Sequence, residues 1–405
     1  MRILFIQIPG YTKASDKGIY PDLIRYFKNK KHEIYVVTSF ERNSQKPTTY
    51  YEDNGIHILG VKTLNITKAG TIEKGIGYLT AEGQYKRAIK KYLRDTQIDL
   101  VIYSTGCFLM SSPVEYIKNR DGAMTYLLLK DIFPQNAVDL GMFSKNSIFN
   151  KYFSYRERKS YEAADYIGCM SPRNVEFLLE NNAWIDKDRV EVCPNSVEID
   201  GKLKTLNSEE KCEIRRKYGI PKDKMVIIYG GNLGAPQGIP FLIKAIDAAR
   251  VNDKAFFLVV GSGTYYKAFE TFIKNNNPDN IKLLKALPQN EYNNIVKACD
   301  VGLICLDYRF TIPNYPSRLL AYLQNAMPVL ACTDMSCDTG TIAEKNGYGY
   351  FTPSNSTEGF VKTVQKFTDH PETLKAMGMK GYEFLKKNYL VEQSYNIIMK
   401  HFQNK

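Results

Sequence analysis

Arg318 has the side chain and the sequence context expected of a phosphate-binding residue. It follows Ser317 at the start of a helix predicted at 317–325, between short apolar strands predicted at 303–306 and 328–331. Such a strand–helix–strand unit binds ligands beyond the carboxyl ends of its strands. A guanidinium beside the N–H groups of a helix start can donate two parallel hydrogen bonds to a phosphate. The local pattern leaves an alternative open, in which Ser317 merely caps the helix and Arg318 is solvated.

The composition is that of a soluble protein with more than one domain. The chain has 405 residues, 44% hydrophobic and 24% charged, and no run approaches the roughly 20 apolar residues of a membrane span. The eight cysteines include no CxxC pair, and no histidine lies at metal-ligand spacing, so we expect free thiols and no metal site. The opening MRILFIQIPG resembles a first strand rather than a signal sequence, which predicts a cytoplasmic protein.

The net charge of +12 does not by itself indicate a nucleic-acid partner. Basic residues are spread over both halves of the chain, and no nucleic-acid-binding motif accompanies them. We therefore expect no nucleic acid among the partners.

Buried strands and amphipathic helices alternate in two successive series. The first series has strands expected at 2–8, 33–38, 56–61, 99–103, 126–129, 165–169 and 190–192, with a basic helix at 84–95. A polar stretch at 202–213 is typical of an interdomain linker. The series then resumes with strands expected at 225–229, 256–260 and 281–284 before the unit that carries Arg318. The pattern predicts an α/β protein of two doubly wound, Rossmann-like domains that face each other across a cleft.

A helix expected within 143–159 combines aromatic and basic residues. Phe149, Tyr152, Phe153 and Arg156 recur at helical spacing, and basic residues outnumber acidic ones around them. Such a helix could lie on a membrane surface. The alternative, which we favour, is that the aromatic residues belong to the core and the charged residues form a solvated face.

Several loop motifs together resemble a known family. They are KDIFPQNAVDLGMF at 130–143, PNSV at 194–197, GGNLGAPQG at 230–238, GSG at 261–263, ALP at 286–288 and YPSRLLAYLQNAMPVLA at 315–331. Their order resembles the GT-B glycosyltransferases, in particular the retaining family-4 group of the bacterial capsule and O-antigen type. The resemblance covers nearly the whole chain. It implies an acceptor-binding domain at 1–198, a nucleotide-sugar-binding domain at 199–388 and a C-terminal helix at 389–405 that packs back on the first domain.

The resemblance also implies roles for individual residues. Arg318 and Asp131 are the implied catalytic residues, with Asp131 near the position of the family's usual histidine. The implied donor-binding residues are Gly18, Gly231, Asn232, Leu233, Gln237, Leu287, Pro288, Asn314, Tyr315 and Ser317. Arg318 and the backbone N–H groups at 231–233 would hold the diphosphate. The residues alone leave alternatives open, in which Asp131 is an ordinary cap or pairs with Lys130, Gly18 is a helix-start glycine, and 287–288 form a turn.

The chain departs from the family pattern at the donor site. Pro313 and Ala321 stand where the family has two glutamates that contact the sugar and the ribose. Asn232 and Gln237 replace an arginine and a lysine of the family. The diphosphate end of the site is therefore expected to be retained, whereas the ribose and sugar end must be built differently.

The function that this resemblance implies is transfer of a hexosyl or N-acetylhexosaminyl group from a nucleotide-diphosphate sugar, with UDP as the expected nucleotide. The acceptor is expected to be lipid-linked or a glycan in surface polysaccharide biosynthesis, and no metal or other cofactor is expected. Peripheral contact with the inner face of the membrane through 143–159 belongs to the same hypothesis. The alternatives are a sugar-nucleotide epimerase of the same fold and a non-catalytic nucleotide-sugar-binding subunit.

Overall fold

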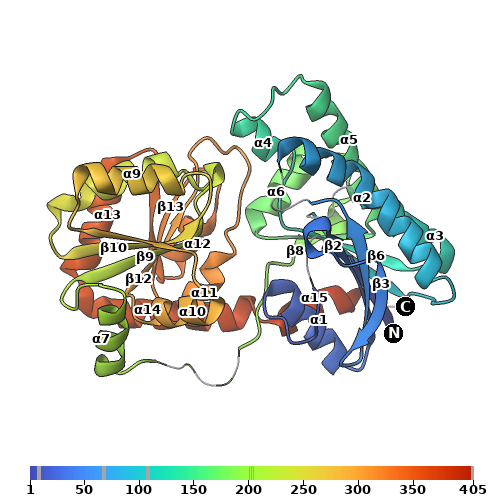
Figure 1. Cartoon of the computed structure of the whole chain (residues 1–405), viewed down its shortest axis with the longest axis horizontal. Helices are drawn as coiled ribbons and strands as arrows, with labels where there is room; N and C mark the ends of the chain where they lie inside the picture. Colours follow the sequence, from blue (N-terminus) through green and yellow to red (C-terminus); the bar gives the residue numbers. More distant parts are fainter. Residues whose placement is uncertain are drawn as a thin grey trace. The chain divides into compact units, whose positions relative to one another are not determined.

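The chain divides into two compact units in the computed structural model (Figure 1). The structure describes residues 1–6, 11–65, 70–105, 110–199, 201, 203 and 205–402. The first unit consists of Met1–Glu198 together with Leu390–Lys405, and the second of Ile199–Tyr389. The C-terminal segment thus belongs to the same unit as the N-terminus.

The first unit is built on an eight-stranded sheet in the order β3-β4-β2-β1-β5-β6-β7-β8. All neighbouring strands are parallel except β3, which pairs antiparallel with β4. The strands are β1 Arg2–Ile6, β2 Glu33–Glu41, β3 Thr49–Asp53, β4 Ile56–Thr63, β5 Leu100–Ser104, β6 Met124–Leu129, β7 Tyr166–Cys169 and β8 Val190–Val192. The central strands are mostly apolar and buried because helices cover both of their faces.

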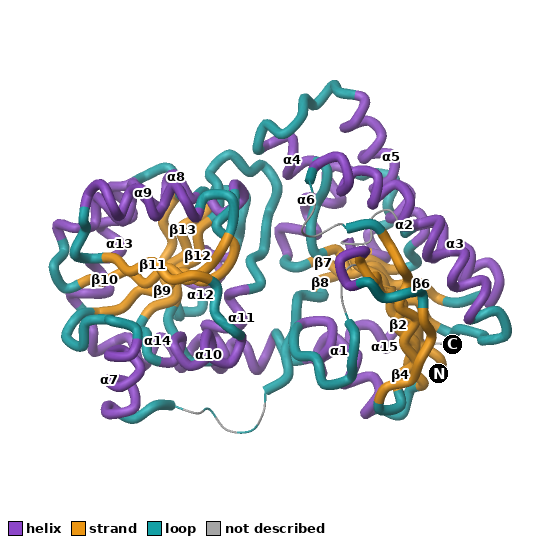
Figure 2. Tube along the Cα trace, in the orientation of Figure 1, coloured by secondary structure: helices purple, strands orange, loops and turns teal. Residues whose placement is uncertain are grey.

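Two helical layers enclose this sheet (Figure 2). One face is covered by α2 Thr71–Tyr92, α3 Ser111–Asp121, α5 Ile148–Ala163 and α6 Pro172–Asn181. The other is covered by α1 Ile19–Asn29 and by α15 Val391–Met399, whose Tyr395 packs 4.8 Å from the ring of Phe27. A short helix, α4 Gln135–Asp139, follows β6.

The second unit contains a fully parallel six-stranded sheet in the order β11-β10-β9-β12-β13-β14. Its strands are β9 Met225–Asn232, β10 Ala255–Ser262, β11 Ile281–Lys285, β12 Val301–Cys305, β13 Val329–Thr333 and β14 Gly349–Pro353. Its helices are α7 Ser208–Lys217, α8 Ile239–Ala248, α9 Tyr266–Asn276, α10 Gln289–Lys297, α11 Arg318–Gln324, α12 Thr339–Lys345, α13 Thr357–Asp369 and α14 Leu374–Asn388. Short 3-10 helices complete the two units at Arg42–Ser44, Lys187–Arg189, Ala235–Gln237, Ala249–Val251, Pro371–Thr373 and Lys400–Phe402.

Most strands lie where the sequence predicts them, but two predicted helices and the predicted linker are wrong in extent. The basic helix expected at 84–95 is the second half of α2, which begins at Thr71. The aromatic helix expected from 143 begins at Ile148, because the Ser147 hydroxyl caps it by accepting the N–H of Asn150. Its aromatic residues are not all buried as the core alternative required, since Phe149 and Tyr152 are exposed. The expected linker at 202–213 includes the start of α7, where Asn207 and Glu210 form a capping box. Residues 7 and 8 of the first expected strand lie outside the described residues.

The cysteines of the described chain are free thiols. Seven are described, and all but Cys212 are buried; Cys107 lies outside the described residues. Within the described ranges, no helix is long and apolar enough to span a membrane, and no group of three or more potential ligand side chains is placed to hold a metal ion.

Candidate functional site

The strand–helix–strand unit predicted around Arg318 is present in the second unit. β12 and β13 pair in parallel, and α11 connects them. β9 lies on the other side of β12, so the loops after all three strands meet at one edge of the sheet. The loop after β9 contacts the loop after β12, where the N–H of Asp307 donates to the carbonyl of Pro236 at 3.0 Å. This carboxyl edge is where a doubly wound domain binds its ligand.

The guanidinium of Arg318 packs against an aromatic ring and lacks a counter-ion in the described chain. Its central carbon lies 4.4 Å from the centroid of the Tyr229 ring. Nη1 is buried and, among the described residues, has no hydrogen-bond partner. No described carboxylate forms an ion pair with Arg318, whereas Arg309 nearby pairs with Asp307 at 2.8 Å. The prediction that Arg318 is merely solvated is therefore wrong. A cation that is shielded from water and has no counter-ion is energetically unfavourable, and an anionic ligand would offset this cost.

Three tyrosines surround this cation. The Tyr322 hydroxyl donates to the carbonyl of Ile228 at 3.1 Å and accepts the N–H of Gly230 at 3.4 Å. The Tyr292 hydroxyl lies so close to Gly230 that a Cβ there would be 1.8 Å from it. Burial raises the pKa of Tyr292 to about 12, against the opposing effect of Arg318, and burial likewise raises the pKa of Tyr229. The phenols stay protonated near neutral pH, so they cannot neutralise the guanidinium.

Glycines at the ends of β9 and β10 allow the two strands to approach closely beside Arg318. A Cβ on Gly261 would lie 1.9 Å from the carbonyl oxygen of Gly231. Gly231 itself has φ 132°, and a Cβ there would lie 3.3 Å from Nη2 of Arg318. The backbone around the cation is therefore accessible only because these positions lack side chains.

Among the three amides expected to face a diphosphate, that of Leu233 is already engaged. Its N–H donates to the carbonyl of Ser262 at 2.8 Å, and its side chain is fully buried. The expectation of a free amide is wrong at this position, because Leu233 turns inward after β9 to join the loop that follows β10. Gly231 and Asn232 are the last residues of β9.

Asn232 and Gln237, the two amide residues that replace the family's cations, contact each other. The Asn232 amide nitrogen donates to the Gln237 side-chain oxygen at 3.0 Å. The two side chains thus form a neutral polar pair beside the β9 loop. Arg318 has no ion pair among the described residues, and its Nη1 atom is buried without a hydrogen-bond partner there.

The loop between β12 and α11 carries three predicted donor-binding residues in different environments. Ser317 is exposed, and its side chain accepts no capping hydrogen bond, so the alternative that it caps α11 is wrong. The carbonyl of Asn314 accepts the Cys337 thiol at 2.9 Å, which ties this loop to the loop after β13. The Asn314 side-chain nitrogen is buried without a hydrogen-bond partner among the described residues.

Tyr315 is a packing residue rather than a ligand residue in this structure. It is 8% exposed, its hydroxyl hydrogen-bonds that of Tyr389, and their ring centroids lie 6.3 Å apart. The structure does not support the implied role of Tyr315 in donor binding, because its hydroxyl group is hydrogen-bonded within the second unit.

Replacing Tyr315 with Phe should therefore lower the free energy of unfolding by about 1 kcal/mol, the net value of one hydrogen bond. Chemical denaturation measures this loss, and calorimetric titration with nucleotide should give an unchanged dissociation constant. Weakened nucleotide binding at unchanged stability would instead make Tyr315 a ligand residue.

Leu287 and Pro288 lie at the start of α10. Leu287 is half-buried and Pro288 exposed, and the Pro288 carbonyl accepts the N–H of Tyr292 at 2.9 Å. Pro288 is the N-terminal cap of α10, the helix that carries Tyr292 to Gly230. Sequence reasoning missed Tyr292 and Tyr322. The available signal was that Tyr322 lies four residues after Arg318, on the same face of α11.

In the first unit, Asp131 follows β6 in an exposed position. The Thr105 hydroxyl accepts the backbone N–H groups of both Asp131 (2.8 Å) and Lys130 (2.9 Å). The Lys130 ammonium donates to the carbonyl of Cys193 at 3.0 Å, and burial lowers the pKa of Lys130 to about 8. Because Lys130 binds this carbonyl, no ion pair with Asp131 is formed in the described chain. Asp131 as a residue is exposed at the carboxyl edge of the sheet, and desolvation by its surroundings raises the pKa of its carboxyl group.

Gly18 is the N-terminal cap of α1, as the alternative reading of this glycine proposed. It has φ 137°, and its N–H donates to the Asp22 carboxylate at 3.2 Å. Arg25 pairs with the same carboxylate. Both the Gly18 amide and its neighbouring cation are therefore engaged within the first unit.

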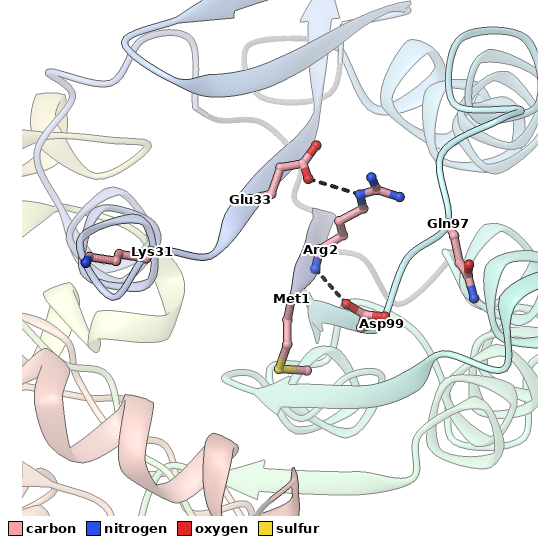
Figure 3. A pocket seen from close by; sticks show the side chains of 6 residues that line it. All are labelled: Met1, Arg2, Lys31, Glu33, Gln97 and Asp99. Atoms are coloured by element: carbon pink, nitrogen blue, oxygen red, sulfur yellow. Dashed lines mark hydrogen bonds and ion pairs between the residues drawn. The ribbon is translucent and has the colours of Figure 1, made fainter.

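A separate hollow lies at the opposite, amino edge of the first sheet (Figure 3). It is lined by Met1, Arg2, Lys31, Glu33, Gln97 and Asp99. The Arg2 guanidinium binds Glu33 at 3.0 Å, and the Arg2 backbone N–H donates to Asp99 at 2.7 Å. Arg2, Glu33 and Asp99 satisfy one another, and Lys31 is exposed, so the hollow offers no buried unpaired charge comparable to Arg318.

Comparison with known proteins identifies the second unit. Residues 210–384 match the family model of "Glycosyl transferases group 1". These residues lie within the second unit. They include the complete six-stranded sheet, the tyrosine cluster and Arg318.

The chain is also similar to individual proteins over most of its length. The "Probable glycosyltransferase WbjE" of Pseudomonas aeruginosa is 24% identical over 304 residues, covering 75% of this chain and 74% of the relative. WaaG, "a glycosyltransferase involved in lipopolysaccharide biosynthesis", superposes with a TM-score of 0.67 at 12% identity over 98% of this chain and 99% of WaaG. HepE of Anabaena, in complex with UDP-glucose, gives a TM-score of 0.71 at 13% identity over the full length of both chains. The chain has the GT-B fold.

Proposed function

We propose that this protein transfers a hexosyl or N-acetylhexosaminyl group from a nucleotide-diphosphate sugar to a lipid-linked or glycan acceptor. The observation that carries the proposal is the buried Arg318 guanidinium, which has no counter-ion in the described chain, at the ligand-binding edge of the second unit. A diphosphate supplies the anionic partner that this group lacks.

The chemistry assigned to Arg318 is stabilisation of the departing diphosphate. When the bond between the sugar and the phosphate breaks, negative charge grows on the phosphate oxygens, and a fixed donor lowers the energy of that state. The planar guanidinium is held on the Tyr229 ring, so little reorganisation is needed when the charge develops. We propose that this cation makes a divalent metal unnecessary and that transfer occurs with retention of anomeric configuration.

We further propose that Asp131 orients the acceptor hydroxyl from the first unit. Its backbone is fixed by Thr105, while the residue itself is exposed. A carboxylate in this setting can accept a hydrogen bond from a sugar hydroxyl. Gly231, Asn232 and Gln237, together with Asn314, Ser317, Leu287 and Pro288, remain the proposed donor contacts of the second unit.

The biological setting that we propose is surface polysaccharide biosynthesis of the capsule or O-antigen type, with UDP as the nucleotide. Support comes from the name of WaaG, which is described as involved in lipopolysaccharide biosynthesis, and from the UDP-glucose bound to HepE. A lipid-linked acceptor places the protein at the cytoplasmic face of the membrane, with peripheral contact through residues 143–159.

A screen of nucleotide sugars tests the proposal and separates it from two alternatives. We expect UDP and UDP-sugars to raise the melting temperature, because a ligand at 100 times its dissociation constant stabilises the folded state by about 2.7 kcal/mol. Purified protein with donor and a lipid-linked acceptor should release UDP. Isomerisation of the donor without acceptor would indicate an epimerase. Binding without isomerisation or turnover would indicate a non-catalytic subunit, which the residues Pro313 and Ala321 motivate.

A further inference from the structure

The edge of the second unit that carries Arg318 has no excess of positive charge. The loops after β9, β12 and β13, together with the first residue of α11, contain fewer cations (Arg309 and Arg318) than carboxylates (Asp307, Asp334 and Asp338). The Arg309 guanidinium is bound to Asp307 at 2.8 Å, so its charge is neutralised within the loop after β12. An anionic ligand at these loops is therefore attracted mainly by Arg318.

Two of these carboxylates are buried and held in place by the loops themselves. Asp334 is 2% exposed, and its Oδ1 atom accepts the backbone N–H groups of Ser336 and Cys337, each at 2.9 Å. Asp307 is 7% exposed and also accepts the backbone N–H of Arg309 at 3.1 Å. Carboxylates that are fixed by hydrogen bonds cannot turn away when a ligand brings further negative charge to the same loops.

The neutral amide pair of Asn232 and Gln237 lies between the guanidinium of Arg318 and these carboxylates. The Tyr229 ring that packs against the guanidinium donates its hydroxyl group to the Asn232 carbonyl at 2.7 Å. The carbonyl of the residue before Gln237 accepts the N–H of Asp307 at 3.0 Å. The two amide side chains bind each other at 3.0 Å. Amide groups donate and accept hydrogen bonds without carrying charge, so this pair adds no electrostatic attraction for a phosphate.

The terminal phosphate distinguishes a nucleoside diphosphate from the nucleotide sugar that yields it. A terminal phosphate has a second pKa of about 6, so near neutral pH it carries close to one more negative charge than the same phosphate bound to a sugar. A site with several unpaired cations would favour the more highly charged ligand. A site with a single unpaired cation and fixed carboxylates favours the less charged one, because like charges brought together lower the affinity.

We propose that Asn232, Gln237 and the carboxylates of these loops make the site select the nucleotide sugar over the nucleoside diphosphate that transfer releases. Arg318 supplies the fixed cation for the two phosphates, and the neutral amide pair keeps the additional charge of the product from being stabilised. The inference rests on the proposed function and deepens it, because it names the residues that limit the affinity for the product and hence the time for which the product stays bound.

Calorimetric titration of the full-length protein with UDP and with UDP-glucose tests the proposal. We expect the wild type to bind UDP-glucose at least as tightly as UDP. The variant Asn232→Arg/Gln237→Lys places two cations beside Arg318 and should bind UDP about tenfold more tightly, the equivalent of one charge-assisted hydrogen bond. Its affinity for UDP-glucose should increase less, so the variant should prefer UDP.

The matched control Asn275→Arg/Gln365→Lys adds the same charges at exposed positions of α9 and α13. It should leave the ratio of the two dissociation constants unchanged. Gln237→Lys alone should shift this ratio in the same direction as the double variant, so the test does not depend on the folding of one protein.

Three results would overturn the inference while leaving the proposed donor site intact. They are tighter binding of UDP than of UDP-glucose by the wild type, an unchanged ratio in both variants at the amide pair, and an equal shift in the control. A wild type that binds neither ligand would overturn the proposed function together with this inference.

Discussion

Replacing Arg318 with Met should weaken binding of a nucleoside diphosphate by about 10- to 100-fold, the equivalent of losing one or more charge-assisted hydrogen bonds. The free protein should not lose more than about 1 kcal/mol of stability. A buried cation without a counter-ion costs desolvation energy, and an apolar side chain of similar length removes that cost along with the contact to Tyr229. The variant should therefore separate binding from folding.

Calorimetric titration with UDP and chemical denaturation measure the two quantities. Arg250→Ala is a suitable control, because Arg250 pairs with Asp247 on α8 and lies outside the proposed site. It should leave UDP affinity unchanged. If Arg318→Met instead unfolds the protein, or binds UDP like the wild type, Arg318 is a structural residue and the proposed diphosphate site is wrong.

Replacing Gly261 with Ala should destabilise the second unit by about 1–3 kcal/mol or more and weaken nucleotide binding. The added methyl group would meet the Gly231 carbonyl oxygen at 1.9 Å, and this atom belongs to the backbone of a paired strand. A backbone carbonyl cannot rotate away as a side chain can, so β9 and β10 must separate. Gly231 would then shift relative to Arg318. Denaturation and calorimetric titration of the variant measure both effects.

Replacing Gly75 with Ala, by contrast, should increase the stability of the protein. Gly75 is exposed within α2, and a Cβ there would meet no atom within 4 Å. Alanine in a helix interior should therefore stabilise the protein by about 0.5–1 kcal/mol. If Gly261→Ala and Gly75→Ala changed the stability in the same direction, this would contradict the close approach of β9 and β10.

The elements around Arg318 could be predicted from sequence because their signals are local. Short apolar runs bounded by polar loops identified β12 and β13, and helical spacing identified α11 between them. Elements with weaker local signals were missed or misjudged. Three glycines at 70–77 hid the first half of α2, since glycine lowers helix propensity. The antiparallel strand β3 was missed although Asn54-Gly55 after it is a strong hairpin signal.

The candidate site was predictable in part only, because its composition depends on contacts between distant residues. Arg318 could be identified from its place at a helix start. That Tyr292 approaches Gly230 across 62 positions, and that Tyr315 pairs with Tyr389, follows from tertiary packing that no local pattern encodes. The amide of Leu233 illustrates the same point, since its hydrogen bond to Ser262 depends on the pairing of β9 with β10.

The most direct test of the central claim is a crystal structure of the protein with UDP. Binding of the diphosphate to the second unit predicts a phosphate oxygen about 2.7–2.9 Å from a guanidinium nitrogen of Arg318, the usual length of a charge-assisted hydrogen bond. UDP bound with its phosphates away from Arg318, and the guanidinium still unpaired on the Tyr229 ring, would contradict the claim.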